Sequence, residues 1–238
     1  IEATLKKAKD IIDNLHEDDL GSLKEDGYDL LKKYGFPIEK YPEFAAFLAQ
    51  HPADLIRMAE SSDNNSRNLF KYGLPAVKDL LVTGKLSWEE VVDGLPKMVV
   101  AAGGNAGSLF RYSLRAFKDL IKEHPEYWPG MVKMAESAGN KSEYLFGSGL
   151  PAVKDLIPDK LSWEEVVDGL PRMVVVGEGN SAYMFQIGFP AIKDLLVSGK
   201  ISWEEVVDGL PRVVVKITYE ELNTLFRYGL PIVMDLLI

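Results

Sequence analysis

The sequence predicts an all-α fold, a right-handed α-solenoid of about six two-helix repeats of about 39 residues each. The first observation is an eleven-residue block that occurs three times, twice identically and once with a single change. The second is another block, Leu69 to Leu80, which recurs four times between the copies of the first. The third is that both blocks place apolar residues at three- and four-residue steps, the period of a helix with one buried face. The eleven-residue block lies at Leu86 to Pro96, Leu161 to Pro171 and Ile201 to Pro211.

The first predicted helix of each repeat, the A segment, contains the eleven-residue block. It opens with Ser87, Ser162 or Ser202 followed by Trp-Glu-Glu, and serine is a favourable N-cap before acidic residues in a first turn. Its expected core positions are Trp88, Val91, Val92, Leu95, Met98 and Val99. The A segment ends in a glycine-rich turn such as Gly103-Gly104-Asn105, and we expect this asparagine to cap the next helix.

The second predicted helix, the B segment, has Gly-Leu-Pro or Gly-Phe-Pro in its middle. The proline position falls at residues 37, 75, 115, 151, 190 and 231, so successive repeats are 36 to 41 residues apart. Proline inside a helix removes a hydrogen bond and clashes with the preceding turn, so we attribute a kink to it. The third repeat has Ser113 and Arg115 instead, and we expect a straighter B helix there. Glycine at Gly84 and Gly199 fits the left-handed residue that ends a helix.

We expect residues 1–238 to form a single domain, with 1–50 a degenerate N-terminal capping repeat and 51–238 five clearer repeats. The chain has no cysteine, which excludes disulfides, zinc–cysteine sites and thiol nucleophiles. The net charge of -9 argues against nucleic acid as a partner. No apolar run approaches the roughly 20 residues that span a bilayer, and no signal peptide is recognisable, so we expect a cytoplasmic protein without a membrane partner. The apolar end, Leu236 to Ile238, suggests an end-to-end or homo-oligomeric contact.

Several motifs resemble nucleotide-binding, metal-binding or catalytic motifs, but each has a simpler structural explanation. Gly177 to Ala182 matches the letters of a dinucleotide fingerprint, although its counterparts in other repeats lie at helix ends rather than after strands. His51 and His124 each precede a proline at the same repeat position, which is typical of a structural turn. Adjacent acids such as Glu89 and Glu90 diverge by about 100° on a helix and form no acid–base dyad. We therefore expect no enzyme activity, no cofactor and no metal.

At this level the chain resembles the HEAT repeats and their armadillo relatives. The shared features are a Leu-Pro in the first helix, a short turn, a polar cap and an apolar–basic pair early in the second helix, here Phe70-Lys71, Phe110-Arg111 and Phe226-Arg227. The chain departs from the family in having Asn65, Asn105 or Asn180 at a cap where Asp is usual, and in the Gly-Pro of the second helix. The resemblance covers residues of about 50 to 238, and it implies a groove that binds other proteins.

A helical wheel of the B segment places Phe70, Leu74, Val77 and Leu81 toward the core and leaves a polar stripe outside. This stripe repeats as a lysine row beside an aspartate row, and as a second row of cations and tyrosines. Tyrosine and arginine often dominate binding energy, so we expect the stripe to bind a protein or an extended, acidic peptide. The candidate residues are Lys71, Tyr72, Lys78, Arg111, Tyr112, Lys118, Lys154, Gln186, Lys193, Arg227 and Tyr228.

Alternatives to binding remain at this stage. The lysine and aspartate rows could simply pair between adjacent repeats in water. The chain could be a HEAT-like enzyme that acts on a nucleic acid base or a pigment, in which case residues unique to one repeat, such as Tyr127, Trp128, Tyr183 and Gln186, deserve inspection. It could also be an engineered or purely structural array.

Overall fold

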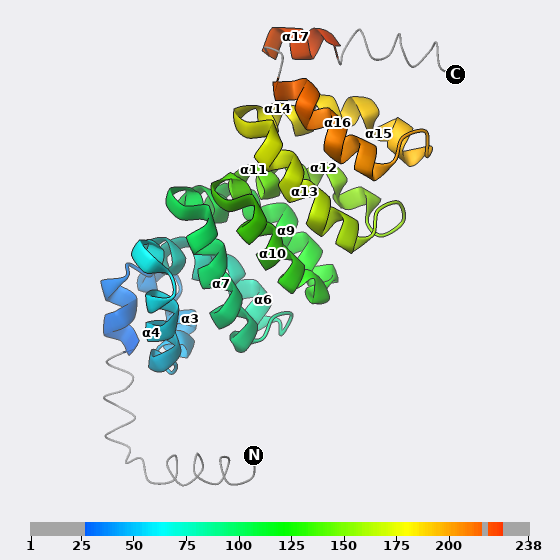
Figure 1. The fold of residues 1–238 in the computed structure, drawn as a ribbon. Helices are drawn as coiled ribbons and strands as arrows, with labels where there is room; N and C mark the ends of the chain where they lie inside the picture. The colour runs from blue at the N-terminus through cyan, green and yellow to red at the C-terminus, as the bar shows by residue number, and fades with distance from the viewer. Residues whose placement is uncertain (1–26, 216–218, 226–238) are drawn as a thin grey trace, which may run out of the picture.

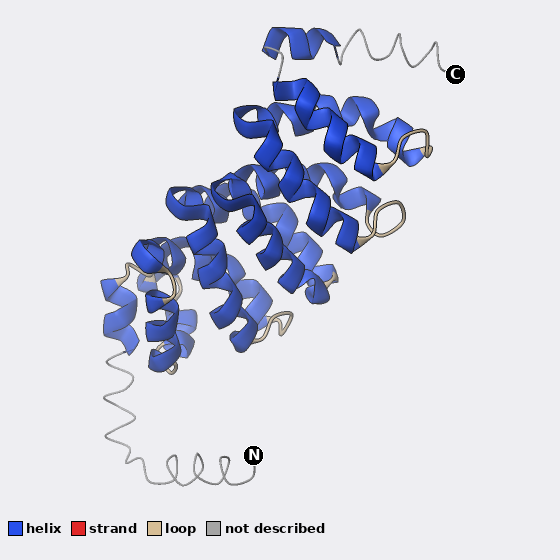
Figure 2. Ribbon diagram, in the orientation of Figure 1, coloured by secondary structure: helices blue, strands red, loops and turns tan. Residues whose placement is uncertain are grey.

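The computed structural model describes residues 27–215 and 219–225, and for residues 112–116, 219, 222 and 223 it describes the backbone alone. Every regular element in this part of the chain is helical (Figure 2), as the sequence predicts. No helix within it is long and apolar enough to span a membrane. The prediction of an all-α fold is confirmed for these residues.

The A segments form one row of helices, which stands at the front of Figure 1. Neighbouring A helices contact each other in chain order, each packing against the next. The helices of this A row are α4 (Pro52–Glu60), α7 (Trp88–Ala102), α10 (Trp128–Ala138), α13 (Trp163–Gly177) and α16 (Trp203–Val215).

The B segments form a second row behind the first, and each packs on the A helices around it. Each begins with a short helix, continues through a π-helical turn and ends in a further helix. The segments are α5 (Ser66–Asn68), η3 (Leu69–Gly73) and α6 (Leu74–Val82); α8 (Ala106–Ser108), η5 (Leu109–Ser113) and α9 (Leu114–Glu123); α11 (Ser142–Tyr144), η8 (Leu145–Gly149), α12 (Leu150–Val153) and the 3-10 turn η9 (Lys154–Leu156); and α14 (Ser181–Tyr183), η11 (Met184–Gly188) and α15 (Phe189–Val197).

Shorter elements complete the described chain. At the N-terminal end, residues 27–33 are helical and are followed by η1 (Ile38–Lys40) and α3 (Pro42–Leu48). The A-to-B turns are the 3-10 helices η2 (Asp63–Asn65), η4 (Gly103–Asn105), η7 (Gly139–Lys141) and η10 (Glu178–Asn180). The remaining elements are η6 (Pro125–Tyr127), which precedes α10, and α17 (Tyr219–Thr224).

The serine N-caps form as predicted. The hydroxyl of Ser87 accepts from the backbone N–H of Glu90, whose carboxylate accepts from the backbone N–H of Ser87, a reciprocal capping box. Ser162 and Ser202 form the same box with Glu165 and Glu205. The core positions predicted from α7 are buried, except that Trp88 is half-buried.

The prediction that asparagine side chains cap the second helix of each repeat is wrong. Asn65, Asn105 and Asn180 make no side-chain cap hydrogen bond to the helix that follows. Asn105 instead donates to the carbonyl oxygen of Asn140 at 2.9 Å, and Asn180 donates to that of Val214 at 3.2 Å. These acceptors lie 35 and 34 residues further along the chain, so the asparagines link one repeat to the next.

Proline is not required for the π turn of the B segments. The backbone N–H of Leu74 donates to the carbonyl of Leu69, five residues earlier, which widens the turn where Pro75 has no N–H to donate. The third repeat forms the same π turn, η5, followed by α9, although it has no proline there. The π turn therefore does not depend on proline, and a straighter B helix in the third repeat stays a prediction. Glycine at this turn permits close packing, because a Cβ on Gly149 would lie 3.1 Å from the ring of Phe185.

Tryptophan packs against glycine in the contacts of α7 with α10, of α10 with α13 and of α13 with α16. A Cβ built on Gly94 would lie 2.8 Å from Cζ2 of Trp128, and one on Gly169 would lie 2.5 Å from Nε1 of Trp203. Gly130 meets Trp163 in the same way, at 2.5 Å. Only a residue without a side chain leaves room for these rings, so glycine at these three positions sets how closely the A helices approach.

Candidate functional site

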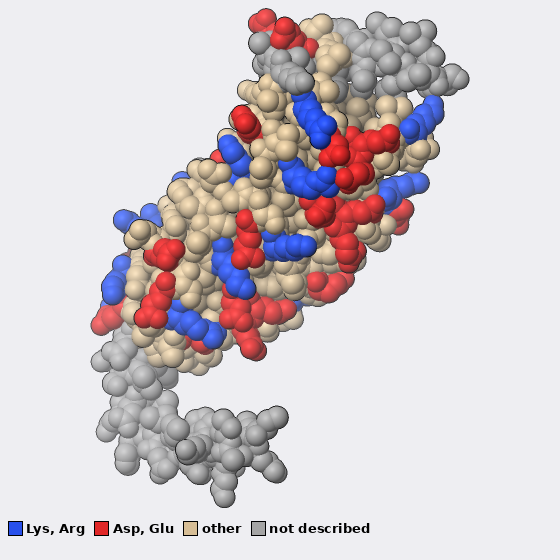
Figure 3. Space-filling model, viewed as in Figure 1, with Lys and Arg blue, Asp and Glu red and all other residues tan. Residues whose placement is uncertain are grey.

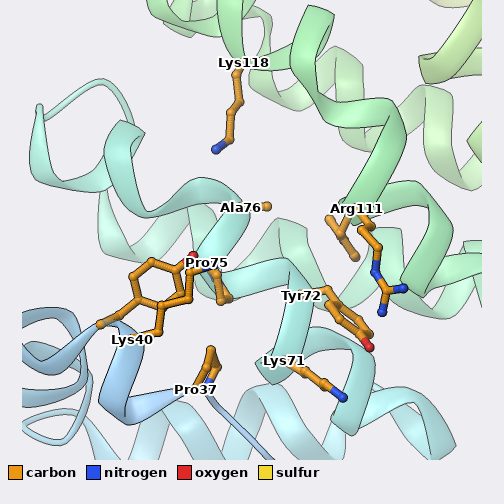
Figure 4. Close-up of a pocket in the computed structure, with 10 residues that line it drawn as sticks. Pro37, Lys40, Lys71, Tyr72, Pro75, Ala76, Arg111 and Lys118 are labelled. Carbon is orange, nitrogen blue, oxygen red and sulfur yellow. The ribbon is translucent and has the colours of Figure 1, made fainter.

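A cavity of about 470 Å³ opens on the B-segment side of the three N-terminal repeats. Four cationic residues line it, drawn from different repeats: Lys40, Lys71, Arg111 and Lys118 (Figure 4). The other lining residues are Pro37, Tyr41, Tyr72, Pro75, Ala76 and Phe110. No aspartate or glutamate is among the described residues that line it. The cavity therefore concentrates positive charge in a chain whose net charge is -9.

The cavity is built by the repeat register. Lys71 and Tyr72 lie in the π turn η3, and Arg111 lies in the corresponding turn η5 of the next repeat. Lys118 projects from α9, toward the space above Ala76 in Figure 4. Because the B segments lie side by side, residues about 40 apart in sequence come together at one opening.

Tyr72 lies between two cations. The guanidinium carbon of Arg111 is 4.4 Å from the centre of its ring, and the ammonium of Lys71 is 5.3 Å from it. Figure 4 shows both side chains beside the phenol. A hydrogen bond from the Lys71 ammonium is the main cause that lowers the pKa of Tyr72 below its ordinary value of 10.0; burial opposes this, and the charge of Arg111 adds to the lowering. The phenol is thus held in a strongly positive environment.

Sequence reasoning missed the first repeat's contribution. Lys40 lies three residues after Pro37, the same register that places Lys78 after Pro75, and it lies 5.2 Å from the ring of Tyr41. Lys33 and Tyr34 likewise repeat the Lys71–Tyr72 pair, at 5.3 Å. The register of Pro37 was visible in the sequence and was the signal that could have found Lys40.

The other candidate residues lie elsewhere. Lys78 lines a neighbouring cavity of about 450 Å³ with Phe44, Phe47 and Trp88, and its ammonium is 5.7 Å from the ring of Tyr41. Lys154, Gln186 and Lys193 continue the rows along later B segments, outside both cavities. The side chain of Tyr112, together with Arg227, Tyr228 and the apolar end Leu236 to Ile238, lies outside the described residues.

The lysine and aspartate rows do not pair between repeats. Lys78 lies 3.9 Å from Asp79, its neighbour in the chain. Lys118, Lys154 and Lys193 form no ion pair with any residue that the structure describes. The hypothesis that these rows are merely inter-repeat salt bridges is wrong for this part of the chain.

The residues that resembled catalytic or ligand-binding groups have structural roles. Gly177 ends α13 and residues 178–180 form the turn η10, so the fingerprint-like letters mark a helix–helix turn. His51 and His124 each precede a helix that begins with proline. Tyr127 stacks on Trp163 at 4.3 Å and Trp128 is buried against Gly94. Among the described residues no three histidine or carboxylate side chains are arranged to hold a metal.

No family model matches the chain, and neither a curated protein nor a solved structure matches it.

Proposed function

We propose that the chain is a right-handed α-solenoid of the HEAT and armadillo kind and a non-catalytic scaffold that binds an extended, acidic segment of a protein partner. The chain-order packing of the A row, with the B row behind it, supports the solenoid. The resemblance in the Leu-Pro, cap and apolar–basic pattern supports the family. The binding surface is the B-segment side.

One observation carries the proposal: four cationic residues from consecutive repeats converge on one cavity without a carboxylate among its described lining. Lys40, Lys71 and Lys118 form no ion pair with any described residue, and bringing these like charges together is unfavourable unless a negative partner compensates them. Tyr41, Tyr72 and Phe110 add aromatic surface beside the cations, a combination that suits a peptide with both acidic and apolar side chains. The lining residues come from three successive repeats, so an extended segment that crosses these repeats can contact all of them.

The test uses fluorescein-labelled twelve-residue peptides, one set rich in Glu and Asp with a single aromatic residue, and matched neutral and basic sets. Fluorescence anisotropy measures their affinity for the full chain. We expect acidic peptides to bind, and Lys71→Glu with Lys118→Glu to weaken binding by at least about tenfold, since both charges face the peptide.

The matched control is Lys154→Glu with Lys193→Glu. It makes the same change in net charge at two lysines of the B segments that lie outside the cavity. We expect it to alter affinity by less than about twofold at physiological salt, where distant charges are screened. Equal loss in both double variants, or equal binding of acidic and basic peptides, would overturn the proposal. Circular dichroism melting of both variants checks that folding is unchanged.

A further inference from the structure

The cavity of about 450 Å³ between α3 and α6 differs in character from the cation-lined one, and we call the two the apolar cavity and the cationic cavity. Phe47 packs edge-on against Trp88 in the wall of the apolar cavity, with the ring centres 5.6 Å apart. A concave site of this volume with a mostly apolar wall and a few polar groups is the usual form of a pocket for an apolar group. Its apolar lining residues are Phe44, Phe47, Leu81, Val82, Leu86 and Trp88.

The apolar cavity uncovers positions that are buried in later repeats. Leu81 is half-buried, whereas Ile121 and Leu196, which occupy its register, are buried. Val82 is 70% exposed, more than any other large apolar side chain that the structure describes, whereas Val197 at its register is 37% exposed. The walls come from the first and second repeats, so the cavity lies within the described part of the chain and not at one of its ends.

A break in the first B segment gives the apolar cavity its place. In the second repeat the residues after the proline continue as one helix, α6. In the first repeat they form η1 and then α3, which begins at Pro42, and Tyr41 between them has a φ of -135° and a ψ of 60°. The separate helix α3 therefore stands opposite α6, and the cavity lies between them.

The two cavities adjoin at Tyr41. Tyr41 lines the cationic cavity, and the ammonium of Lys78, which lines the apolar cavity, is 5.7 Å from the centre of its ring. On α6, Ala76 lines the cationic cavity and Leu81 and Val82 line the apolar one. Helical residues rise about 1.5 Å each, so these positions lie about 8 to 9 Å apart along α6. An extended chain covers that length in about three residues.

The polar groups of the apolar cavity are one lysine and one glutamate. The Lys78 ammonium is 3.9 Å from the carboxylate of Asp79, its neighbour in the chain. Glu43 forms no ion pair with any residue that the structure describes. An acidic group that enters the apolar cavity is therefore repelled by Glu43, and a basic group beside it is attracted.

The face of the A row suits an acidic segment less well. Figure 3 shows that face, where basic side chains lie among acidic ones. Arg172, for example, is 2.9 Å from Glu204 and 2.7 Å from Asp208. The cations of that network already have acidic partners, whereas Lys40, Lys71 and Lys118 of the cationic cavity form no ion pair with any described residue.

We propose that the apolar cavity binds an aromatic side chain of the same protein segment whose acids occupy the cationic cavity. The aromatic residue lies three positions beyond the last acid, and a basic residue directly beside it pairs with Glu43. The rings of Phe47 and Trp88 favour an aromatic side chain, because aromatic pairs gain energy beyond their buried area. This inference rests on the proposed function and adds the order and spacing of the residues that are recognised.

The test compares labelled peptides that share an acidic run, two serines, a variable position and a lysine. Anisotropy with the full chain should show that tryptophan at the variable position binds at least about fivefold tighter than alanine there, as for a buried interface anchor. Moving the tryptophan directly after the last acid should remove this gain, because the side chain then falls short of the apolar cavity.

Val82→Glu places a carboxylate at the exposed edge of the apolar cavity and should remove the gain from tryptophan, while the affinity of the alanine peptide changes by less than about twofold. Val197→Glu is the matched control, since it makes the same change at the same register outside both cavities. It should keep the full gain. Circular dichroism melting checks that both variants fold as the original chain does.

A charge swap tests the role of Glu43. The original chain should prefer lysine over glutamate beside the tryptophan, and Glu43→Lys should reverse this preference, because the pair is complementary in either polarity. An unchanged preference would overturn the assignment of Glu43 to this site.

The outcomes separate this inference from the proposed function. Equal binding of the tryptophan and alanine peptides would overturn the inference and leave the proposed function standing, whereas binding of neither would overturn both. A synthetic peptide of residues 1–26 that displaces the tryptophan peptide, but not from the Val82→Glu chain, would assign the apolar cavity to the chain itself. Self-association in sedimentation that Val82→Glu abolishes would assign it to a second copy, and either result would overturn the proposal.

Discussion

The indole N–H of Trp203 donates to the backbone carbonyl oxygen of Glu165 at 2.9 Å, across 38 residues of chain. Trp128 makes the same bond to Glu90, also 38 residues earlier, at 3.1 Å. In both cases the carbonyl lies one turn before the glycine against which the ring packs. The hydrogen bond and the missing side chain therefore act together to fix the separation of consecutive A helices.

Gly169→Ala tests this relationship. The added methyl group would lie 2.5 Å from Nε1 of Trp203, a ring held among buried neighbours, so we expect a loss of about 2 to 3 kcal/mol of stability from overpacking. Gly209→Ala is the matched control, because a Cβ built there meets nothing within 4 Å and alanine gains about 0.5 to 1 kcal/mol over glycine in a helix. Urea denaturation measures both. Similar destabilisation by the two substitutions would contradict the role of the glycine.

Ser142 and Ser181 occupy the same repeat position, and both are fully buried, yet they differ in hydrogen bonding. The hydroxyl of Ser181 donates to the carbonyls of Val174 and Glu178, whereas that of Ser142 has no hydrogen-bond partner among the residues that the structure describes. We expect Ser181→Ala to cost about 1 kcal/mol and Ser142→Ala to be neutral or stabilising, since it removes a buried unsatisfied group. The third repeat already has a buried alanine, Ala106, at this position. Thermal unfolding measures the stability of both variants. An equal loss of stability in the two would contradict the predicted difference between Ser181 and Ser142.

Glu178 adopts a backbone conformation that favours glycine. Its φ is 49° and its ψ is -128°, and the corresponding residues of two other turns are Gly103 and Gly139, with φ of 55° and 57°. A side chain in this region costs roughly 1 to 3 kcal/mol. Glu178→Gly should therefore stabilise the protein by about 1 kcal/mol and raise the melting temperature. Glu178→Ala keeps the strain while removing the charge, so a similar gain with alanine would show that charge, not conformation, was responsible.

The cations around Tyr72 should change the pKa that a titration of its phenol measures. Positive charge favours the phenolate, so Lys71→Met and Arg111→Gln should each raise the pKa of Tyr72 back toward 10.0, with Lys71 giving the larger change. Since the folded pKa is the lower one, the phenolate's contribution to stability is complete above pH 10.0 and is lost as the pH falls through the folded value. At neutral pH Tyr72 is neutral and contributes nothing of this kind.

NMR of tyrosine labelled with ¹³C at the ring ζ carbon follows this titration, and a Tyr72→Phe spectrum assigns the signal. Lys154→Gln, a charge loss outside the cavity, is the control and should leave the pKa of Tyr72 in place. No shift on removing either Lys71 or Arg111 would contradict the arrangement around the phenol.

Much of the local structure could be predicted from the sequence because its causes are local. A serine three residues before a glutamate forms a capping box whatever lies beyond the helix, and a three- and four-residue apolar period selects which face is buried. The same register placed Lys71, Tyr72, Arg111 and Lys118 on one surface. Their convergence on a single cavity depends on how closely neighbouring B segments pack, which periodicity does not specify.

Two features could not be predicted from the sequence, for one physical reason. An asparagine after a helix end can donate either to its own turn or to another part of the chain, and Asn105 and Asn180 bond to the next repeat. A proline marks a place where an N–H is missing, but the π turn of the third repeat forms without one. In both cases the choice depends on groups brought close only when the repeats stack.

The sequence by itself determined which segments are helical, where those helices begin and which of their faces are apolar, since these follow from backbone capping and side-chain spacing within one repeat. Only the tertiary structure decided that Trp128 and Trp203 pack against glycines of the preceding A helices. The reason is distance along the chain: partners 38 residues apart are not specified by any local rule, and they meet only after both helices have found their neighbours.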